Sequence, residues 1–156
     1  MQKITPCLWF NGRVQEALEF YTSVFKDSRV KGVTRYPKGS PMPEGEYMTA
    51  VFEIQGQEFM LLNGGSTIPF TWAVSFVVNC ADQGETDYYW DRLTANGGSE
   101  EQCGWVKDKF GLSWQVVPAG LDRLYTGTAE QTERVMQAMM KMKKLDLGML
   151  EAAFHG

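Results

Sequence analysis

The side chains best suited to metal binding and nucleophilic catalysis are few in this chain. Its only histidine is His155, one residue from the C-terminus, where a solvent-exposed position is the simplest interpretation. A metal site with two histidine ligands therefore cannot be built from a single copy. The three cysteines, Cys7, Cys80 and Cys103, are spread along the sequence without a CxxC spacing. This usage is typical of reduced thiols, and without a histidine as base we expect Cys103 to be inert.

A glycine-rich turn offers a second possible chemistry. Asn63-Gly64-Gly65 follows a predicted strand, as the glycine turn of a Rossmann-type S-adenosylmethionine or dinucleotide site does. Such a site needs a helix to begin directly after the turn, whereas Ser66-Thr67-Ile68-Pro69 continues as a loop. An ordinary turn explains these glycines. Asp108, flanked by Lys107 and Lys109, is also more typical of a turn than of a catalytic acid or base.

Composition excludes several classes of partner. The chain has 156 residues with 44% hydrophobic and 13% aromatic side chains, which predicts one folded domain rather than disorder. Its net charge of −4 argues against binding to a nucleic-acid backbone. We see no apolar run of the roughly 20 residues that a membrane helix needs, and the N-terminus lacks the anatomy of a signal peptide. Together with the cysteine usage, these features predict a cytoplasmic protein.

An internal repeat organises the elements that carry these side chains. The apolar run Leu8–Phe10 precedes an amphipathic helix, and about seventy residues later Val77–Cys80 does the same. Farther along, Gly56–Leu62 aligns with Gly111–Val117. A repeat of this size is one supersecondary unit that occurs twice.

Periodicity and turn residues predict the individual elements. The first copy reads as a strand over 5–10, a helix over 12–25 and strands over 29–36, 47–54 and 57–62. The second reads as a strand over 70–79, a helix opened by the capping box Asp82/Glu85 and ended by Gly97-Gly98, and strands over 103–106 and 112–117. The capping box Thr128/Gln131 opens a further helix, and a short one follows from Asp146. The predicted fold class is α+β, with βαβββ modules over about 3–65 and 70–120 and a helical tail over about 128–156.

This module order resembles the vicinal-oxygen-chelate (glyoxalase/bleomycin-resistance) superfamily. Within it, the chain is most similar to the PhnB-like group, also labelled 3-demethylubiquinone-9 3-methyltransferase-like. The residues that carry the resemblance are Trp9-Phe10-Asn11-Gly12, Leu62-Asn63-Gly64-Gly65, Ser75–Cys80, the run Gln102–Pro118 and the helix Arg134–Met140. The resemblance implies that the two modules curl into a cup, which in this superfamily a partner chain frequently completes.

The resemblance also implies where a metal would bind. Enzymes of the superfamily typically hold a divalent metal with two His and two Glu, one each from the first and last strands of each module. In this chain the last-strand positions fall on Met60 and Gln115, and the first-strand positions fall near Thr5 and near Val74 or Ser75. None of these is a good ligand for such a metal. We therefore expect no protein-bound metal and no cofactor.

By the resemblance, the positions that hold metal ligands in other members of the superfamily would line the cup. Residues two apart on a strand share a face, so their neighbours at that spacing would line it too. Aromatic residues, methionines and a few polar groups make up a typical small-molecule site. The alternative for each large aromatic residue is an ordinary place in the core. The candidate ligand-binding residues are Trp9, Met60, Leu62, Trp105, Asp108 and Gln115.

The sequence thus predicts a metal-free, homodimeric protein that binds a small, partly apolar or aromatic molecule in a cup at or near the dimer interface. One alternative is a metal-independent enzyme, either a transferase such as the methyltransferase of the group's label or an isomerase or lyase. Another is a structural or regulatory dimer whose cup is filled by side chains. The sequence identifies neither the ligand nor a catalytic residue.

Overall fold

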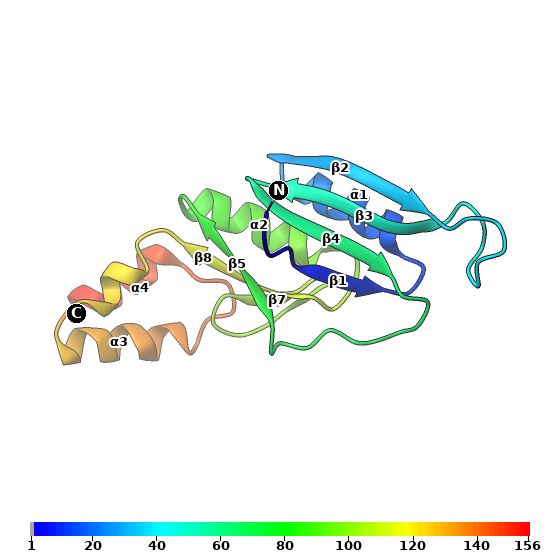
Figure 1. The fold of residues 1–156 in the computed structure, drawn as a ribbon. Coiled ribbons are helices and arrows are strands. Elements are labelled where there is room, and N and C mark those ends of the chain that lie inside the picture. The colour runs from blue at the N-terminus through cyan, green and yellow to red at the C-terminus, as the bar shows by residue number, and fades with distance from the viewer. Residues whose placement is uncertain (1) are drawn as a thin grey trace. The chain divides into compact units, whose positions relative to one another are not determined.

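The computed structural model describes residues 2–156, which divide into two compact units. The first extends to Pro69 and the second runs from Phe70 to Gly156. Each unit holds one four-stranded sheet and the helix that covers it (Figure 1). The predicted α+β fold with a duplicated module and a helical tail is confirmed.

The first unit contains a single βαβββ module. Its elements are β1 (Cys7–Phe10), α1 (Val14–Val24), β2 (Ser28–Arg35), β3 (Tyr47–Ile54) and β4 (Gln57–Asn63). The strand order is β1-β4-β3-β2, in which β1 and β4 are parallel and the remaining pairs are antiparallel. The first and last strands of the module are therefore neighbours.

One face of this sheet packs on α1. The buried stripe of α1 repeats every three to four residues and includes Ala17 and Tyr21. On the sheet, Phe52 and Leu61 are almost fully buried, and the ring of Phe52 stacks on that of Tyr21 at 6.0 Å between centroids. Alternate residues of β3 and β4 are half-buried and lie on the opposite face.

The β3–β4 hairpin turns on Gln55 and Gly56. Both have positive φ, at 47° and 82°, as a two-residue type I′ turn requires. This turn fixes the register in which Glu53 lies opposite Glu58 and Val51 lies opposite Met60.

The second unit repeats the module with shorter outer strands. Its elements are β5 (Ser75–Cys80), α2 (Gln83–Thr94), the 3₁₀ turn η1 (Ala95–Gly97), β6 (Ser99–Glu100), β7 (Trp105–Lys107) and β8 (Ser113–Pro118). The order β5-β8-β7-β6 matches that of the first sheet, and β5 and β8 are again parallel. Whereas β2 and β3 have eight residues each, β6 has two and β7 has three.

Local contacts set the starts of β5 and α2, the first two elements of this module. The side chain of Asp82 accepts a hydrogen bond from the backbone N–H of Glu85 at 2.8 Å and so caps α2 as predicted. The predicted strand over 70–79 begins only at Ser75, because the preceding residues form a turn in which the Val74 amide donates to the Thr71 carbonyl. Their apolar side chains had suggested a longer strand.

The tail beyond the second sheet has a small core of its own. It consists of η2 (Asp122–Tyr125), α3 (Ala129–Met139) and α4 (Leu147–His155), and Thr128 and Gln131 form the predicted capping box. Leu124, Val135, Leu145 and Leu150 are buried together between these elements. Within residues 2–156, the structure has no helix of the length and apolarity needed to cross a membrane.

Replacing Gln55 with asparagine is expected to stabilise the protein. Asparagine tolerates positive φ better than glutamine, and Asn-Gly is the preferred pair in a type I′ turn. The free energy of unfolding, measured by urea titration followed by circular dichroism, should rise by about 0.5–1 kcal/mol. The control is Gln57→Asn two residues later, in a strand, where asparagine is disfavoured. An equal gain in both variants would contradict the turn assignment.

Candidate functional site

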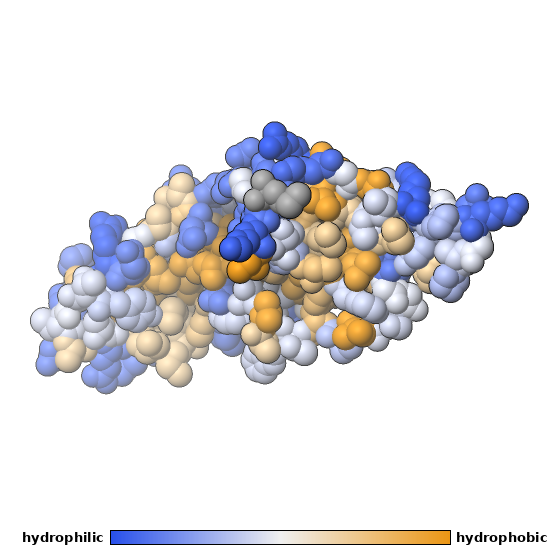
Figure 2. Space-filling view, in the orientation of Figure 1, coloured by the Kyte–Doolittle hydropathy of each residue, from blue (hydrophilic) through white to orange (hydrophobic). Residues whose placement is uncertain are grey.

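Three of the candidate residues share the open face of the first sheet, the face opposite α1. Cys7 is paired with Met60, and Trp9 is paired with Leu62, across the parallel strands β1 and β4. Trp9, Met60 and Leu62 are all half-buried, whereas Leu61 between them is fully buried toward α1. Apolar side chains gather over β1 and β4 in the space-filling view (Figure 2). This face presents an aromatic, partly apolar surface.

The indole of Trp9 is held by the turn that follows β4. Its Nε1 donates a hydrogen bond to the Ser66 carbonyl at 2.8 Å. A Cβ atom on Gly64 would lie only 1.9 Å from Cζ2 of this indole. The turn Asn63-Gly64-Gly65 therefore needs glycine at 64 because the ring of Trp9 packs directly against the backbone there.

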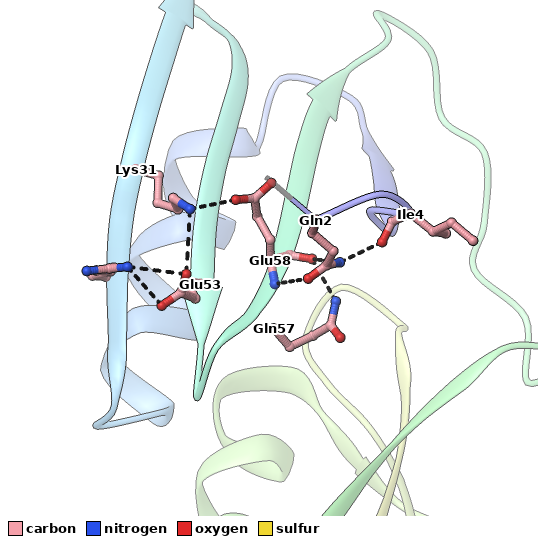
Figure 3. Close-up of polar contacts among 7 residues, drawn as sticks. Gln2, Ile4, Lys31, Glu53, Gln57 and Glu58 are labelled. Carbon is pink, nitrogen blue, oxygen red and sulfur yellow. Dashed lines mark hydrogen bonds and ion pairs between the residues drawn. The ribbon is translucent and has the colours of Figure 1, made fainter.

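A row of charged side chains borders this apolar surface on the same face of the sheet. Glu53 and Glu58 lie opposite each other on β3 and β4. The Nζ of Lys31 lies 2.7 Å from Glu58 and 3.6 Å from Glu53, and Arg29 lies 3.2 Å from Glu53 (Figure 3). We call Arg29, Lys31, Glu53 and Glu58 the ionic row. Its two cations balance its two carboxylates.

A β-bulge in β2 and the side chain of Gln2 help to position the residues of the ionic row. The β2–β3 register shifts between Val30 and Gly32, so Lys31 occupies a β-bulge, a device that re-aims a side chain. The amide side chain of Gln2 accepts from the Glu58 N–H at 3.0 Å and donates to its carbonyl at 3.3 Å (Figure 3). The hydrogen bond from Lys31 lowers the pKa of Glu58, and the same bond raises the pKa of Lys31.

Gln115 and Trp105 are neighbours on the open face of the second sheet. They are paired across β7 and β8, and both are half-buried. The Nε2 of Gln115 donates a hydrogen bond to the Oγ of Ser75 at 2.9 Å. This contact joins the last-strand and first-strand positions at which the superfamily resemblance places metal ligands.

Asp108 lies apart from this face, in the turn between β7 and β8. Its side chain is buried, with 2% of the residue exposed. One oxygen accepts from the Phe110 and Leu112 amides at 2.9 and 3.1 Å, and the other accepts from Nε1 of Trp114 at 2.9 Å. The carboxylate therefore serves to hold the turn and the indole of Trp114, as its flanking sequence suggested.

The donor atoms at the implied metal positions do not fit a His/Glu metal site. Module one offers the thioether of Met60, and module two offers a neutral amide already bonded to a hydroxyl. Among residues 2–156, no three His, Cys, Asp or Glu side chains are grouped as a metal-binding set. Thioether ligands suit Cu(I), whereas the superfamily's typical divalent ions take imidazole and carboxylate.

The two more buried thiols are held in structural surroundings. Cys80 is 1% exposed, and burial raises the pKa of its thiol to about 11. Its thiolate is therefore scarce at neutral pH. Cys103 lies in a turn, where its amide donates to the Met142 carbonyl at 2.9 Å.

The structure thus groups the candidate residues by module, with Trp9, Met60 and Leu62 on one sheet and Trp105 and Gln115 on the other. Sequence reasoning missed the ionic row and the bond from Gln115 to Ser75. Glu53 and Glu58 could have been paired in advance, because they flank the predicted hairpin symmetrically. The bulge that brings Lys31 to them leaves no comparable signal.

Comparison with solved structures defines the class of fold. A PhnB protein from Bacillus cereus, described as a putative 3-demethylubiquinone-9 3-methyltransferase, is 35% identical with a TM-score of 0.68, over 76% of this chain and 100% of that one. Protein PA1353 from Pseudomonas aeruginosa is 21% identical with a TM-score of 0.62, over 76% of this chain and 98% of its own. The fosfomycin resistance protein FosX from Listeria monocytogenes, solved with Mn(II) and sulfate, is 16% identical with a TM-score of 0.55, over 73% and 90%. The fold is that of the vicinal-oxygen-chelate superfamily.

Within that class the family is also defined. The sequence profile described as 3-demethylubiquinone-9 3-methyltransferase matches residues 2–117. The chain belongs to this PhnB-like family, as the sequence resemblance indicated. No curated protein matches the chain.

Removing the central cation of the ionic row should make stability less dependent on pH. Glu58 has a lowered pKa, so its stabilising contribution is present above the ordinary value of 4.5 and is lost as pH falls through the lowered value. Lys31 has a raised pKa, so its contribution is present below 10.5 and is lost as pH rises through the raised value. Lys31→Met should lower the melting temperature between these limits, and the difference from wild type should disappear in stronger acid.

The matched control is Lys38→Met in the exposed loop after β2. Melting temperatures of the three proteins from pH 2 to 8 would be followed by circular dichroism. The melting temperatures of wild type and Lys31→Met should converge near pH 2. If their difference were the same there as at pH 8, the lysine would act through packing rather than through Glu58.

Proposed function

We propose that this protein binds a small, partly apolar or aromatic molecule against the open faces of its sheets, without a protein-bound metal. The observation that carries the proposal is the unequal covering of the first sheet. Its α1 face is closed, with Leu61 and Phe52 at 0% and 1% exposure, whereas Trp9, Met60 and Leu62 on the other face are only half-buried.

The chemistry of these faces defines the ligand class. An indole, a thioether and a leucine side chain favour an apolar or aromatic surface, since burial stabilises by about 25 cal/mol per Å² of apolar area. The ionic row and the Thr34–Thr49 hydroxyl pair, joined at 2.6 Å, border this surface. In the second sheet, the amide of Gln115 can both donate and accept hydrogen bonds. A ligand with an aromatic or aliphatic body and a few polar groups matches these features.

Metal independence is supported by the identity of the residues at the implied ligand positions. FosX was solved with Mn(II). At the last-strand positions where the superfamily resemblance places carboxylate ligands, this chain carries Met60 and Gln115. The Gln115 amide is engaged with Ser75 at 2.9 Å. Any catalysis on such a site would have to use the substrate's own reactivity or a bound organic group.

The competing function is a methyltransferase, because the family's description names that activity. The glycine turn most suggestive of an S-adenosylmethionine site is accounted for by the contact between Gly64 and Trp9. After the turn, the chain continues as a loop to Thr71 and no helix begins there. These observations favour the binding role.

The proposal predicts that gently purified protein carries an organic molecule but no stoichiometric transition metal. Native mass spectrometry would be recorded before and after addition of Mn(II), on wild type and on Gln115→Leu. The substitution removes one hydrogen-bonding group from the open face, so ligand occupancy should fall about tenfold while unfolding free energy changes by no more than about 1 kcal/mol. Added Mn(II) should not bind tightly.

The control for this experiment is Gln137→Leu on the exposed part of α3, which should retain the ligand. One tightly bound Mn, Fe, Ni or Zn per chain would overturn metal independence. Recovery of S-adenosylmethionine would favour the methyltransferase. A Gln115→Leu protein destabilised by several kcal/mol, with no ligand recovered from wild type, would leave Gln115 a structural residue.

We further propose that the protein is a homodimer. Supporting this, β5 is one of the two edge strands of its sheet, and edge strands left uncovered invite pairing. Apolar side chains also lie exposed on and before β5, with Trp72 at 77%, Val74 at 62% and Val77 at 51% exposure. A second copy of the same chain can cover such a patch through a two-fold interface.

Charged substitution within this patch should dissociate the dimer. Light scattering of wild type at micromolar concentration should give the mass of two chains, since a specific interface buries at least roughly 1,000 Å². Val77→Lys should shift the mass toward that of one chain. Val30→Lys, at an equally exposed valine on the edge strand β2, is the matched control. A monomeric wild type, or dissociation by Val30→Lys alone, would refute the assignment.

A further inference from the structure

The second module lacks most of the outer hairpin that completes the first. Strands β6 and β7 together have five residues, against sixteen in β2 and β3. Next to β7, a segment from the tail makes contacts with the sheet instead. We call residues 142–147, which lead from the end of α3 into the first residue of α4, the strap.

Backbone hydrogen bonds join the strap to the turn that precedes β7. The amide of Cys103 donates to the Met142 carbonyl at 2.9 Å, and the amide of Gly104 donates to the Lys143 carbonyl at 2.7 Å. On the other side of the same turn, the Gly104 carbonyl accepts from the Val116 amide of β8 at 2.7 Å. The turn is therefore held between the strap and β8.

Side chains of α2 fix the strap from its other side. The Nε2 of Gln83 donates to the Leu145 carbonyl at 3.0 Å, and its Oε1 accepts from the Leu147 amide at 2.9 Å. The ammonium of Lys144 lies 2.8 Å from the carboxylate of Asp87. A single glutamine side chain thus satisfies two backbone groups of the strap.

The turn itself is one that needs outside support. Cys103 and Gly104 both adopt positive φ, at 57° and 83°. For a cysteine this backbone conformation is strained, and it persists only where the surrounding structure enforces it. Leu145, 1% exposed, fills the space beside Gly104, where an added Cβ would come within 2.9 Å of its Cδ1. The strap supplies both the hydrogen bonds and the packing that enforce this conformation.

We infer that the strap is a positioning element for the open face of the second module, holding the 102–105 turn so that Trp105 stays opposite Gln115. Trp105 directly follows Gly104, and its amide donates to the Gln102 carbonyl at 3.1 Å within the same turn. The inference rests on the proposed binding role of Trp105 and Gln115. It assigns a function to residues beyond the family profile, which ends at residue 117.

The test replaces Gln83 with leucine in the full chain and follows each tryptophan in the absence of ligand. Protein labelled with 5-fluorotryptophan would be examined by ¹⁹F NMR, with the Trp105 signal assigned from Trp105→Phe. In Gln83→Leu, the Trp105 signal should shift or broaden, while those of Trp9, Trp72 and Trp114 should stay in place. Trp90 is not a reference signal, because its indole donates to Glu100 at 2.9 Å and Glu100 lies 3.8 Å from Lys143 of the strap. Hydrogen exchange at the Cys103 and Gly104 amides should accelerate about tenfold, because their partners become mobile.

Arg123→Ala is the matched control, because it removes a tail ion pair to Glu151 that does not involve the strap. Gln83→Glu keeps the acceptor for Leu147 but turns an oxygen toward the Leu145 carbonyl and the Asp87 carboxylate, to which the Gln83 amide donates at 3.0 and 3.2 Å. It should therefore also loosen the strap, and it serves if Gln83→Leu fails to fold. The inference is overturned if Trp105 and both amides are unaffected, or if Trp9 and Trp114 shift as much as Trp105. Since no ligand is used, this outcome is independent of whether the proposed binding function holds.

Discussion

The structure depends on the parallel pairing of the first and last strands within each module. Parallel strands cannot be joined by a tight turn, so the chain must cross over between them. Here that crossover contains a helix and the two outer strands, and the helix packs on one face of the sheet it connects. Each sheet is consequently covered by its helix on one face only, and the candidate binding residues lie on the other face.

Equivalent positions on the two open faces now carry different chemistry. Met60 stands beside Cys7 on an apolar surface bordered by the ionic row. Its counterpart Gln115 stands beside Trp105 and bonds to Ser75. A duplicated scaffold thus carries one face suited to apolar contact and another suited to directed hydrogen bonding.

The sequence predicted those parts of the fold that leave a local pattern. The period of two along β4 places Met60 and Leu62 on one face, and Thr128 and Gln131 form the predicted capping box. Asp82 caps α2 as predicted, but the Glu85 side chain accepts from the Ala81 amide rather than from Asp82. The start of β5 was placed five residues too early, because apolar side chains before Ser75 resemble a strand although the backbone there turns.

The missed features arise from contacts between distant segments. The strap binds through backbone carbonyls of Met142 and Lys143, and a backbone group has the same appearance in every sequence. The bulge at Lys31 similarly depends on the register of the paired strands rather than on residue type. For the candidate site, residue identity could indicate the lining surface, but the partners of Gln115 and Asp108 required three-dimensional structure.

The position of the strap in the chain has a consequence for the order of folding. The strand pairings of the first module all lie within residues 7–63, whereas Gln83 must find groups 62 and 64 residues farther along. Contacts of such separation form slowly, because the entropy of closing the intervening loop is lost before they contribute. During synthesis, the first module can close while the second still waits for residues 142–147 to leave the ribosome. Two modules of the same topology therefore complete folding at different times, and the second remains partly folded, and prone to misfolding, for longer.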